Sequence, residues 1–336
     1  MLANRLRSVT QADEATAIAV AHSTSPYVSA YTWSVLGFGT KYSNPATLPA
    51  NTCYGIALSP DGADIALAHS TSPSVAAYPW SSSGFGTKYS DPATLPVGTS
   101  YGVAFSPDGA DIAVTYTGSP YVSVYPWSAG FGTKYSDPAT LPTGTSYGVA
   151  FSPDGADIAV AHNTSPFVSV YPWSSGFGTK YSDPATLPTG IGKAVAFSPD
   201  GADIAVAHST SPYVTVYPWS SGFGTKYSDP ATLPSGNANG VTFSPSGADI
   251  AVAHSSGASV TVYPWSSGFG AKYSNPATLP AGAGNSVAFS PDGANIAVAH
   301  FSGSRVSVYP WSSGFGAQYS DPATLPPGFG YGVVFI

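Results

Sequence analysis

The chain has 336 residues, of which 43% are hydrophobic and only 8% are charged, and its formal net charge is −7. The hydrophobic content excludes an intrinsically disordered chain, and the acidic balance, with no run of Lys or Arg, argues against a nucleic-acid partner. No segment has the apolar run of a secretory signal or the about 18 apolar residues of a membrane span, so we expect no membrane insertion and leave the compartment open.

Tryptophans mark a tandem repeat with a period of 46 or 47 residues. They are Trp33, Trp80, Trp127, Trp173, Trp219, Trp265 and Trp311. A period in this range is typical of stacked or radially arranged supersecondary units. The seven copies account for nearly the whole chain, so we expect one domain over residues 1–336, with a degenerate N-terminal segment at 1–16 and an extra strand at 331–336.

Each copy contains short apolar segments separated by turn signals. In the fourth copy the first predicted strand covers residues 148–151 (GVAF), followed by a turn at 152–155 (SPDG). The second covers 158–162 (IAVAH) and the third 167–171 (FVSVY). A weaker fourth strand is predicted at 178–181 (GTKY), so we expect four antiparallel strands per copy.

The second strand alternates large with small side chains rather than apolar with polar ones. Ile158 and Val160 alternate with Ala159 and Ala161, so both faces of the sheet are expected to be buried. A sheet buried on both faces needs a sheet on each side, and radial closure provides this without long exposed edges. The sequence therefore predicts an all-β, seven-bladed β-propeller.

The two ends of the chain predict how the ring closes. Residues 331–336 (YGVVFI) repeat the first strand of a copy with nothing after them. In the first copy, the second strand at 17–22 is preceded only by a poor version of a first strand, at 8–11. We expect residues 332–335 to occupy the innermost position of the first blade.

The repeat resembles those of the WD-repeat and YVTN families of β-propellers. The residues that carry the resemblance read AVAFSPDGADIAVAHSTSPYVTVYPW at 194–219. The Trp-Asp pair of the first family is replaced by Tyr-Pro-Trp and its Gly-His dipeptide is absent, so the structural hydrogen-bond tetrad of that family is not carried over.

The copies differ mainly in loops expected on one face of the ring. One variable position lies near the start of each first strand, where it is expected at the mouth of the central channel. It reads Tyr54, Tyr101, Tyr147, Lys193, Asn239, Asn285 and Tyr331. Four neighbouring tyrosines suit recognition because they combine apolar area with a hydroxyl, and we expect these seven residues to make the first contacts with a ligand. The alternative is neutral variation of exposed loops.

Two repeated polar patterns are better explained by structural roles than by metal binding or catalysis. A histidine ends the second strand in six copies, but neighbouring copies lie too far apart to share a zinc ion, so each is expected to bond within its own blade. Asp pairs such as Asp154 and Asp157 lack the spacing of a calcium loop and indicate turns. We therefore predict no metal and no cofactor.

Near-identical blades place near-identical groups around the axis, whereas catalysis needs groups in different environments. The sequence thus favours a non-catalytic scaffold, a monomer that binds a protein or peptide at the variable face. Two alternatives stay open: a lectin-like module with several glycan sites between blades, and a recently amplified or engineered propeller without a ligand.

Overall fold

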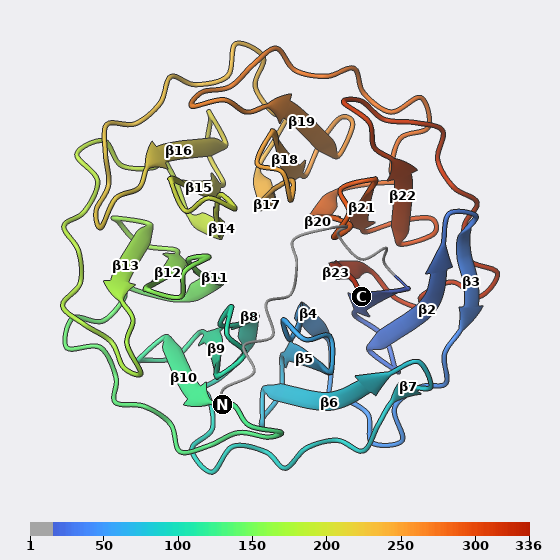
Figure 1. Ribbon diagram of the computed structural model, residues 1–336, viewed down its shortest axis with the longest axis horizontal. Helices are drawn as coiled ribbons and strands as arrows, with labels where there is room; N and C mark the ends of the chain where they lie inside the picture. Colours follow the sequence, from blue (N-terminus) through green and yellow to red (C-terminus); the bar gives the residue numbers. More distant parts are fainter. Residues whose placement is uncertain (1–15) are drawn as a thin grey trace, which may run out of the picture.

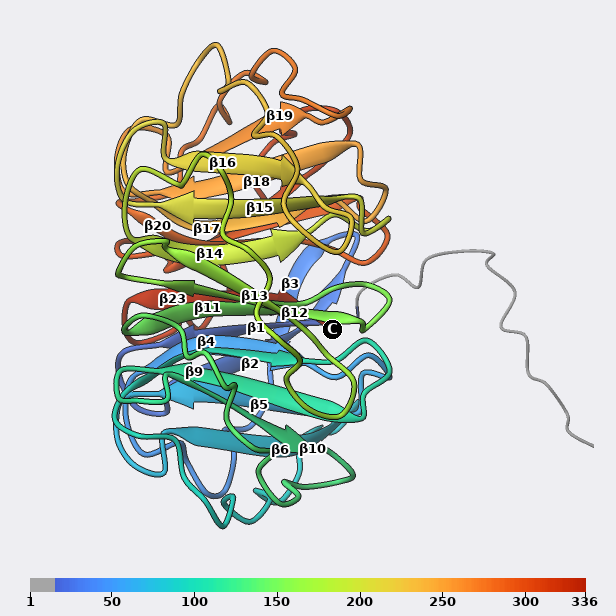
Figure 2. The ribbon, with the colours of Figure 1, turned by 90° about the vertical axis from the view of Figure 1, so that its left-hand side faces the viewer.

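The computed structural model describes residues 16–336, which form seven antiparallel sheets around a central channel (Figure 1). Seen from the side, the strands run between the two faces of the ring (Figure 2). The predicted all-β, seven-bladed propeller is confirmed. The described residues contain no helix, and hence none that could cross a membrane.

Blade 1 contains both ends of the described chain. Its strands, from the channel outward, are β23 (Gly330–Phe335), β1 (Ala17–His22), β2 (Val28–Ser34) and β3 (Gly37–Lys41). Blade 2 also has four strands: β4 (Cys53–Leu58), β5 (Asp64–His69), β6 (Val75–Ser81) and β7 (Gly84–Phe85).

The other five blades have three strands each. Blade 3 contains β8 (Ser100–Phe105), β9 (Asp111–Tyr116) and β10 (Val122–Pro126), and blade 4 contains β11 (Ser146–Phe151), β12 (Asp157–His162) and β13 (Val168–Pro172). Blade 5 contains β14 (Gly192–Phe197), β15 (Asp203–His208) and β16 (Val214–Pro218). Blade 6 contains β17 (Ala238–Phe243), β18 (Asp249–His254) and β19 (Val260–Pro264), and blade 7 contains β20 (Gly284–Phe289), β21 (Asn295–His300) and β22 (Val306–Pro310).

The predicted fourth strand is therefore wrong for blades 3 to 7, and loop length explains why. In blade 1 a two-residue loop separates the paired residues Ser34 and Gly37, so a hairpin forms. Blades 3 to 7 are one residue shorter here, and the loop closes on a single bridge, Trp173 to Phe177 in blade 4. The segment still runs beside the blade, because the Tyr181 N–H donates to the Val170 carbonyl at 3.0 Å.

Ring closure occurs as predicted. β23 lies on the channel side of β1 and pairs with it from Ile18 opposite Phe335 to Ala21 opposite Gly332. Val333 and Phe335 are buried in the core of blade 1. The alternative segment, residues 8–11, lies outside the described residues.

The core lies between neighbouring blades, as the alternation in the second strand predicts. All six residues of β12 are buried. On one side Ile158 packs with Ala113 of blade 3, and on the other Ala159 packs with Ile204 of blade 5. Large side chains of one blade thus fill the space above the alanines of the blade before it.

Candidate functional site

All seven predicted residues line one cavity of about 290 Å³ at the axis of the ring. They lie near the start of the inner strands: Tyr54 in β4, Tyr101 in β8, Tyr147 in β11, Lys193 in β14, Asn239 in β17, Asn285 in β20 and Tyr331 in β23. We call this set the channel ring. It faces the same side as the variable loops, because Cys53, next to Tyr54, pairs with His69 at the base of such a loop.

Small residues allow the inner strands to approach closely enough to form this ring. A Cβ added at Gly55 would lie 2.5 Å from the Tyr101 carbonyl oxygen, and one added at Gly102 would lie 2.6 Å from that of Tyr147. A side chain at either position would push the neighbouring strand away. These glycines therefore fix the spacing of the channel ring.

Four tyrosines form a continuous arc of the ring. The ring centroids are 4.9 Å apart for Tyr101 and Tyr147, 5.0 Å for Tyr54 and Tyr101, and 4.8 Å for Tyr54 and Tyr331. Burial, followed by the neighbouring tyrosines, raises the pKa of Tyr101 above its usual value. Burial also raises the pKa of Tyr147 and of Tyr331, so these three phenols stay protonated at neutral pH and can donate hydrogen bonds to a ligand.

Lys193 continues the arc beyond Tyr147. Its Nζ lies 4.1 Å from the centroid of the Tyr147 ring, a cation–π contact. Among residues 16–336 the salt bridges involve other lysines, each with an aspartate three positions later, and none involves Lys193. Burial lowers the pKa of Lys193. The ring therefore holds a partly desolvated cation without a protein counter-ion.

Two asparagines complete the ring with acceptors. The Asn239 Nδ2 donates to the Gly284 carbonyl at 2.9 Å, and the Asn285 Nδ2 donates to the Gly330 carbonyl at 2.7 Å. These bonds orient both amides and leave their Oδ1 atoms free to accept. In ring order Lys193 thus stands between a hydroxyl donor, Tyr147, and an amide acceptor, Asn239, so the seven equivalent positions carry non-equivalent chemistry.

The histidines are structural, as predicted. The His162 Nε2 lies 3.0 Å from the Ser169 Oγ of the same blade, and burial lowers the pKa of His162 to about 4, so the imidazole is neutral. His69 is the exception, because Ala76 replaces the hydroxyl residue and the ring nitrogens have no partner. Within the described range no group of three His, Cys, Asp or Glu side chains could hold a metal ion.

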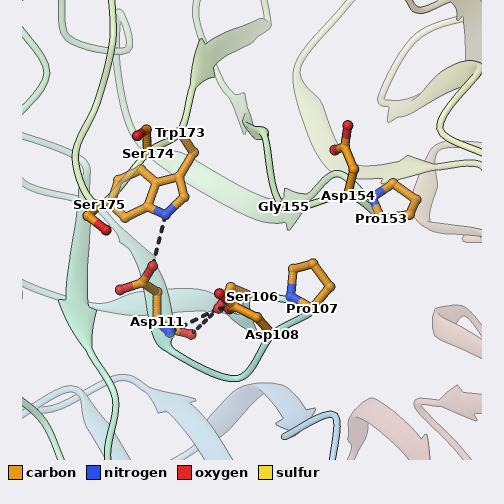
Figure 3. A pocket seen from close by; sticks show the side chains of 10 residues that line it. All are labelled: Ser106, Pro107, Asp108, Asp111, Pro153, Asp154, Gly155, Trp173, Ser174 and Ser175. Atoms are coloured by element: carbon orange, nitrogen blue, oxygen red, sulfur yellow. Dashed lines mark hydrogen bonds between the residues drawn. The ribbon is translucent and has the colours of Figure 1, made fainter. Parts of the chain in front are cut away.

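Pockets also lie between blades on the opposite face (Figure 3). The pocket between blades 3 and 4 contains the turn residue Asp108, whose Oδ1 accepts from the Ser106 hydroxyl at 2.6 Å, as the turn interpretation predicts. The second aspartate has a role that the sequence did not reveal. Asp111 Oδ2 accepts from the Trp173 indole of the next blade at 2.9 Å, and its Oδ1 accepts from the Tyr135 hydroxyl at 2.9 Å.

Near-copies of this pocket occur at neighbouring interfaces, with similar lining residues. A carboxylate with one oxygen bonded by the next blade and the other bonded by the outer segment of its own blade acts as a structural link. Copies of the same link give no single pocket a distinct chemistry. The channel ring is the better candidate site because its residues differ from one another.

The chain matches no protein-family model and no curated protein. Among solved structures it is similar to a putative 6-phosphogluconolactonase from Bacteroides uniformis, with 14% identity and a TM-score of 0.71 over 96% of this chain and 100% of that one. It is also similar to the periplasmic gluconolactonase of Pseudomonas aeruginosa, with 17% identity and a TM-score of 0.69 over 95% and 99% of the two chains. A third is hydrazine synthase of Kuenenia stuttgartiensis, with 18% identity and a TM-score of 0.64 over 85% and 89%.

These likenesses support the propeller fold and correct two predictions. The finer resemblance to WD-repeat proteins is not supported, since the neighbours include propellers described as lactonases. The prediction of a non-catalytic scaffold is wrong for the same reason: a closed ring of blades is a fold that proteins described as lactonases use. The symmetry argument failed physically because it ignored the channel ring, where the copies carry different groups.

Proposed function

We propose that the protein hydrolyses a lactone, a cyclic ester, at the channel ring. The observation that carries the proposal is Lys193, a partly desolvated cation without a counter-ion, placed between a hydroxyl donor and an amide acceptor. Such a cation is suited to stabilise the negative charge that develops on a carbonyl oxygen during ester hydrolysis. The likeness to propellers described as lactonases adds support.

In the proposed reaction the lactone carbonyl oxygen lies between the Lys193 ammonium and the Tyr147 hydroxyl. A water molecule, oriented by a hydrogen bond to the Asn239 Oδ1, attacks the carbonyl carbon, and charge moves onto the carbonyl oxygen. The bond between that carbon and the ring oxygen then breaks. One proton of the attacking water goes to the ring oxygen, which becomes a hydroxyl, and the other is released to the solvent as the new carboxyl group ionises, so one water is consumed and one proton released for each lactone opened.

The electrostatics of the mouth favour this assignment of roles. None of the seven channel-ring residues is an Asp, Glu or His, so no carboxylate neutralises Lys193 and no imidazole competes as the base. Burial strengthens the interaction of the ammonium with a developing oxyanion, because the local dielectric constant is below that of water.

The test is lactone opening by the purified protein, measured in a pH-stat with glucono-δ-lactone against the uncatalysed rate. We expect Lys193→Met to lower kcat/KM by about 100-fold to 1,000-fold, as loss of an oxyanion donor does, and Lys193→Arg to keep part of the activity because it keeps the cation. Lys226→Met is the matched control, since Lys226 pairs with Asp229 at the outer edge of blade 5. Equal activity of Lys193→Met and wild type would refute the proposal.

A further inference from the structure

An aromatic surface continues outward from the channel ring at blade 7. The Phe301 ring centroid lies 5.6 Å from that of Tyr331 and 5.2 Å from that of Phe329, and both contacts are edge-to-face. We call Phe301 and Phe329 the blade 7 extension. With the tyrosine arc it gives an uninterrupted row of rings from Tyr147 to Phe329, and Lys193 stands at the inner end of the row.

This extension occurs once in the ring, where Phe301 follows β21 of blade 7 and Phe329 precedes β23 of blade 1. Small or mostly polar residues occupy the equivalent positions elsewhere. They are Ser23, Ser70, Thr117, Asn163, Ser209 and Ser255 for Phe301, and Thr52, Thr99, Thr145, Ile191, Asn237 and Ala283 for Phe329. Since six of the seven blades fold without phenylalanine at each of these places, the fold does not require the two rings.

The extension is nevertheless held firmly. The Phe329 N–H donates to the Ser23 Oγ at 2.9 Å and its carbonyl accepts from the Ser23 N–H at 3.1 Å, which fixes the backbone against blade 1. Arg305 lies over the Phe329 ring, 5.6 Å from its centroid, and donates to the Phe301 carbonyl at 2.6 Å. Phe329 is 46% exposed despite these contacts. A large, fixed and exposed aromatic beside a polar cavity is typical of a ligand contact.

The geometry points to the lactone of an oligosaccharide as the substrate class, an inference that rests on the proposed function. We propose that the lactone ring binds at Lys193 and that the sugar rings after it lie along the tyrosine arc and the blade 7 extension. A sugar ring presents C–H groups that pack on aromatic rings and hydroxyls that bond to phenols, which matches a row of tyrosines with phenylalanines at its end. An acyl chain would instead cover the half-buried phenol groups without offering them partners.

The test compares kcat/KM for the lactones of a monosaccharide, a disaccharide and a trisaccharide. We expect the trisaccharide lactone to gain about tenfold over glucono-δ-lactone, the size of one or two aromatic contacts. The double variant Phe301→Ser with Phe329→Thr, which installs residues that other blades already carry, should lose that gain. It should leave kcat/KM for glucono-δ-lactone within about twofold of wild type, because neither ring belongs to the channel ring.

The control is Leu36→Ser, which removes a side chain that is 90% exposed in a turn on the opposite face, and it should change neither value. Thermal unfolding is measured to check that all variants are folded. If glucono-δ-lactone is hydrolysed but longer lactones show no gain, or keep it in the double variant, the inference falls and the proposed function stands. If no lactone is hydrolysed, calorimetry with cellotriose tests sugar binding by itself. Binding that the double variant loses supports the inference that sugars lie along the row of aromatic rings, and no binding overturns it.

Discussion

Removing β23 tests whether the ring is held closed by its own C-terminal strand. Deletion of residues 330–336 takes two buried side chains out of blade 1, since Val333 is 5% exposed and Phe335 is 3% exposed. Loss of the Phe335 ring alone corresponds to about 3–5 kcal/mol. Val333 adds about 1.5–3 kcal/mol, and the backbone groups of β1 lose their partners. Because the whole folding free energy of a domain is about 5–15 kcal/mol, we expect the truncated chain to be largely unfolded or aggregated.

The assay is urea unfolding followed by tryptophan fluorescence, with and without a synthetic peptide of residues 330–336. The peptide should restore the transition in a concentration-dependent way, because it can add to β1 as the missing strand. A peptide with serine in place of Val333 and Phe335 is the control and should not rescue. An unchanged urea midpoint for the truncated chain would refute the closure argument.

Two pH dependences follow from the buried groups. If the Lys193 ammonium stabilises the oxyanion, lactone hydrolysis should fall as pH rises through the lowered pKa of Lys193, below the usual lysine range near 10.5, and Lys193→Arg should lack this fall. The folded-state pKa of His162 is about 4 against 6.5 for a free histidine, so the unfolded chain takes up protons first as the solution is acidified. The free energy of unfolding should therefore decrease as pH falls from about 6.5 to 4. His162→Tyr should reduce this decrease, because Tyr116 occupies the same place in blade 3 and bonds Ser123 at 2.6 Å; an equal decrease in this variant would contradict the assignment.

The fold could be predicted because all seven repeats carry the same pattern of strand and turn residues. The buried second strand, its large and small alternation and the unmatched final segment predicted a closed ring, and the pairing of Ile18 with Phe335 confirms it. The outer strand was predicted wrongly because one residue in a turn decides whether a hairpin or a single bridge forms, as the contrast between Ser34 and Trp173 shows. Strand propensity alone does not report loop length.

The position of the channel ring was predicted, and its role in binding or catalysis stays a proposal. Variation at one place in each repeat located all seven residues, and the structure brings them around one cavity. Contacts between blades could not be predicted from the sequence, because they depend on the angle between neighbouring sheets. The bond from Trp173 to Asp111 joins residues 62 positions apart, and the contact of Phe301 with Tyr331 follows from how blade 7 meets blade 1. The constant spacing of a repeated Asp and Trp was the sequence signal from which the bond between Trp173 and Asp111 could have been predicted.

The same cross-blade bonds explain why the C-terminal strand matters to the ring. Five tryptophans, those of blades 3 to 7, donate to an aspartate of the preceding blade. Within residues 16–336 neither Trp33 nor Trp80 has such a bond, and Asn295 stands where blade 7 would provide the carboxylate. The two interfaces beside blade 1 therefore lack this indole–carboxylate bond. They keep the tyrosine hydroxyl bonds, from Tyr31 to the Thr324 carbonyl and from Tyr78 to the Thr47 carbonyl, both at 2.8 Å, and β23 packs against the blade on each side. The blade 7 extension lies at one of these interfaces, so a ligand that bridges blades 7 and 1 would stabilise the ring at a place that lacks the indole–carboxylate bond.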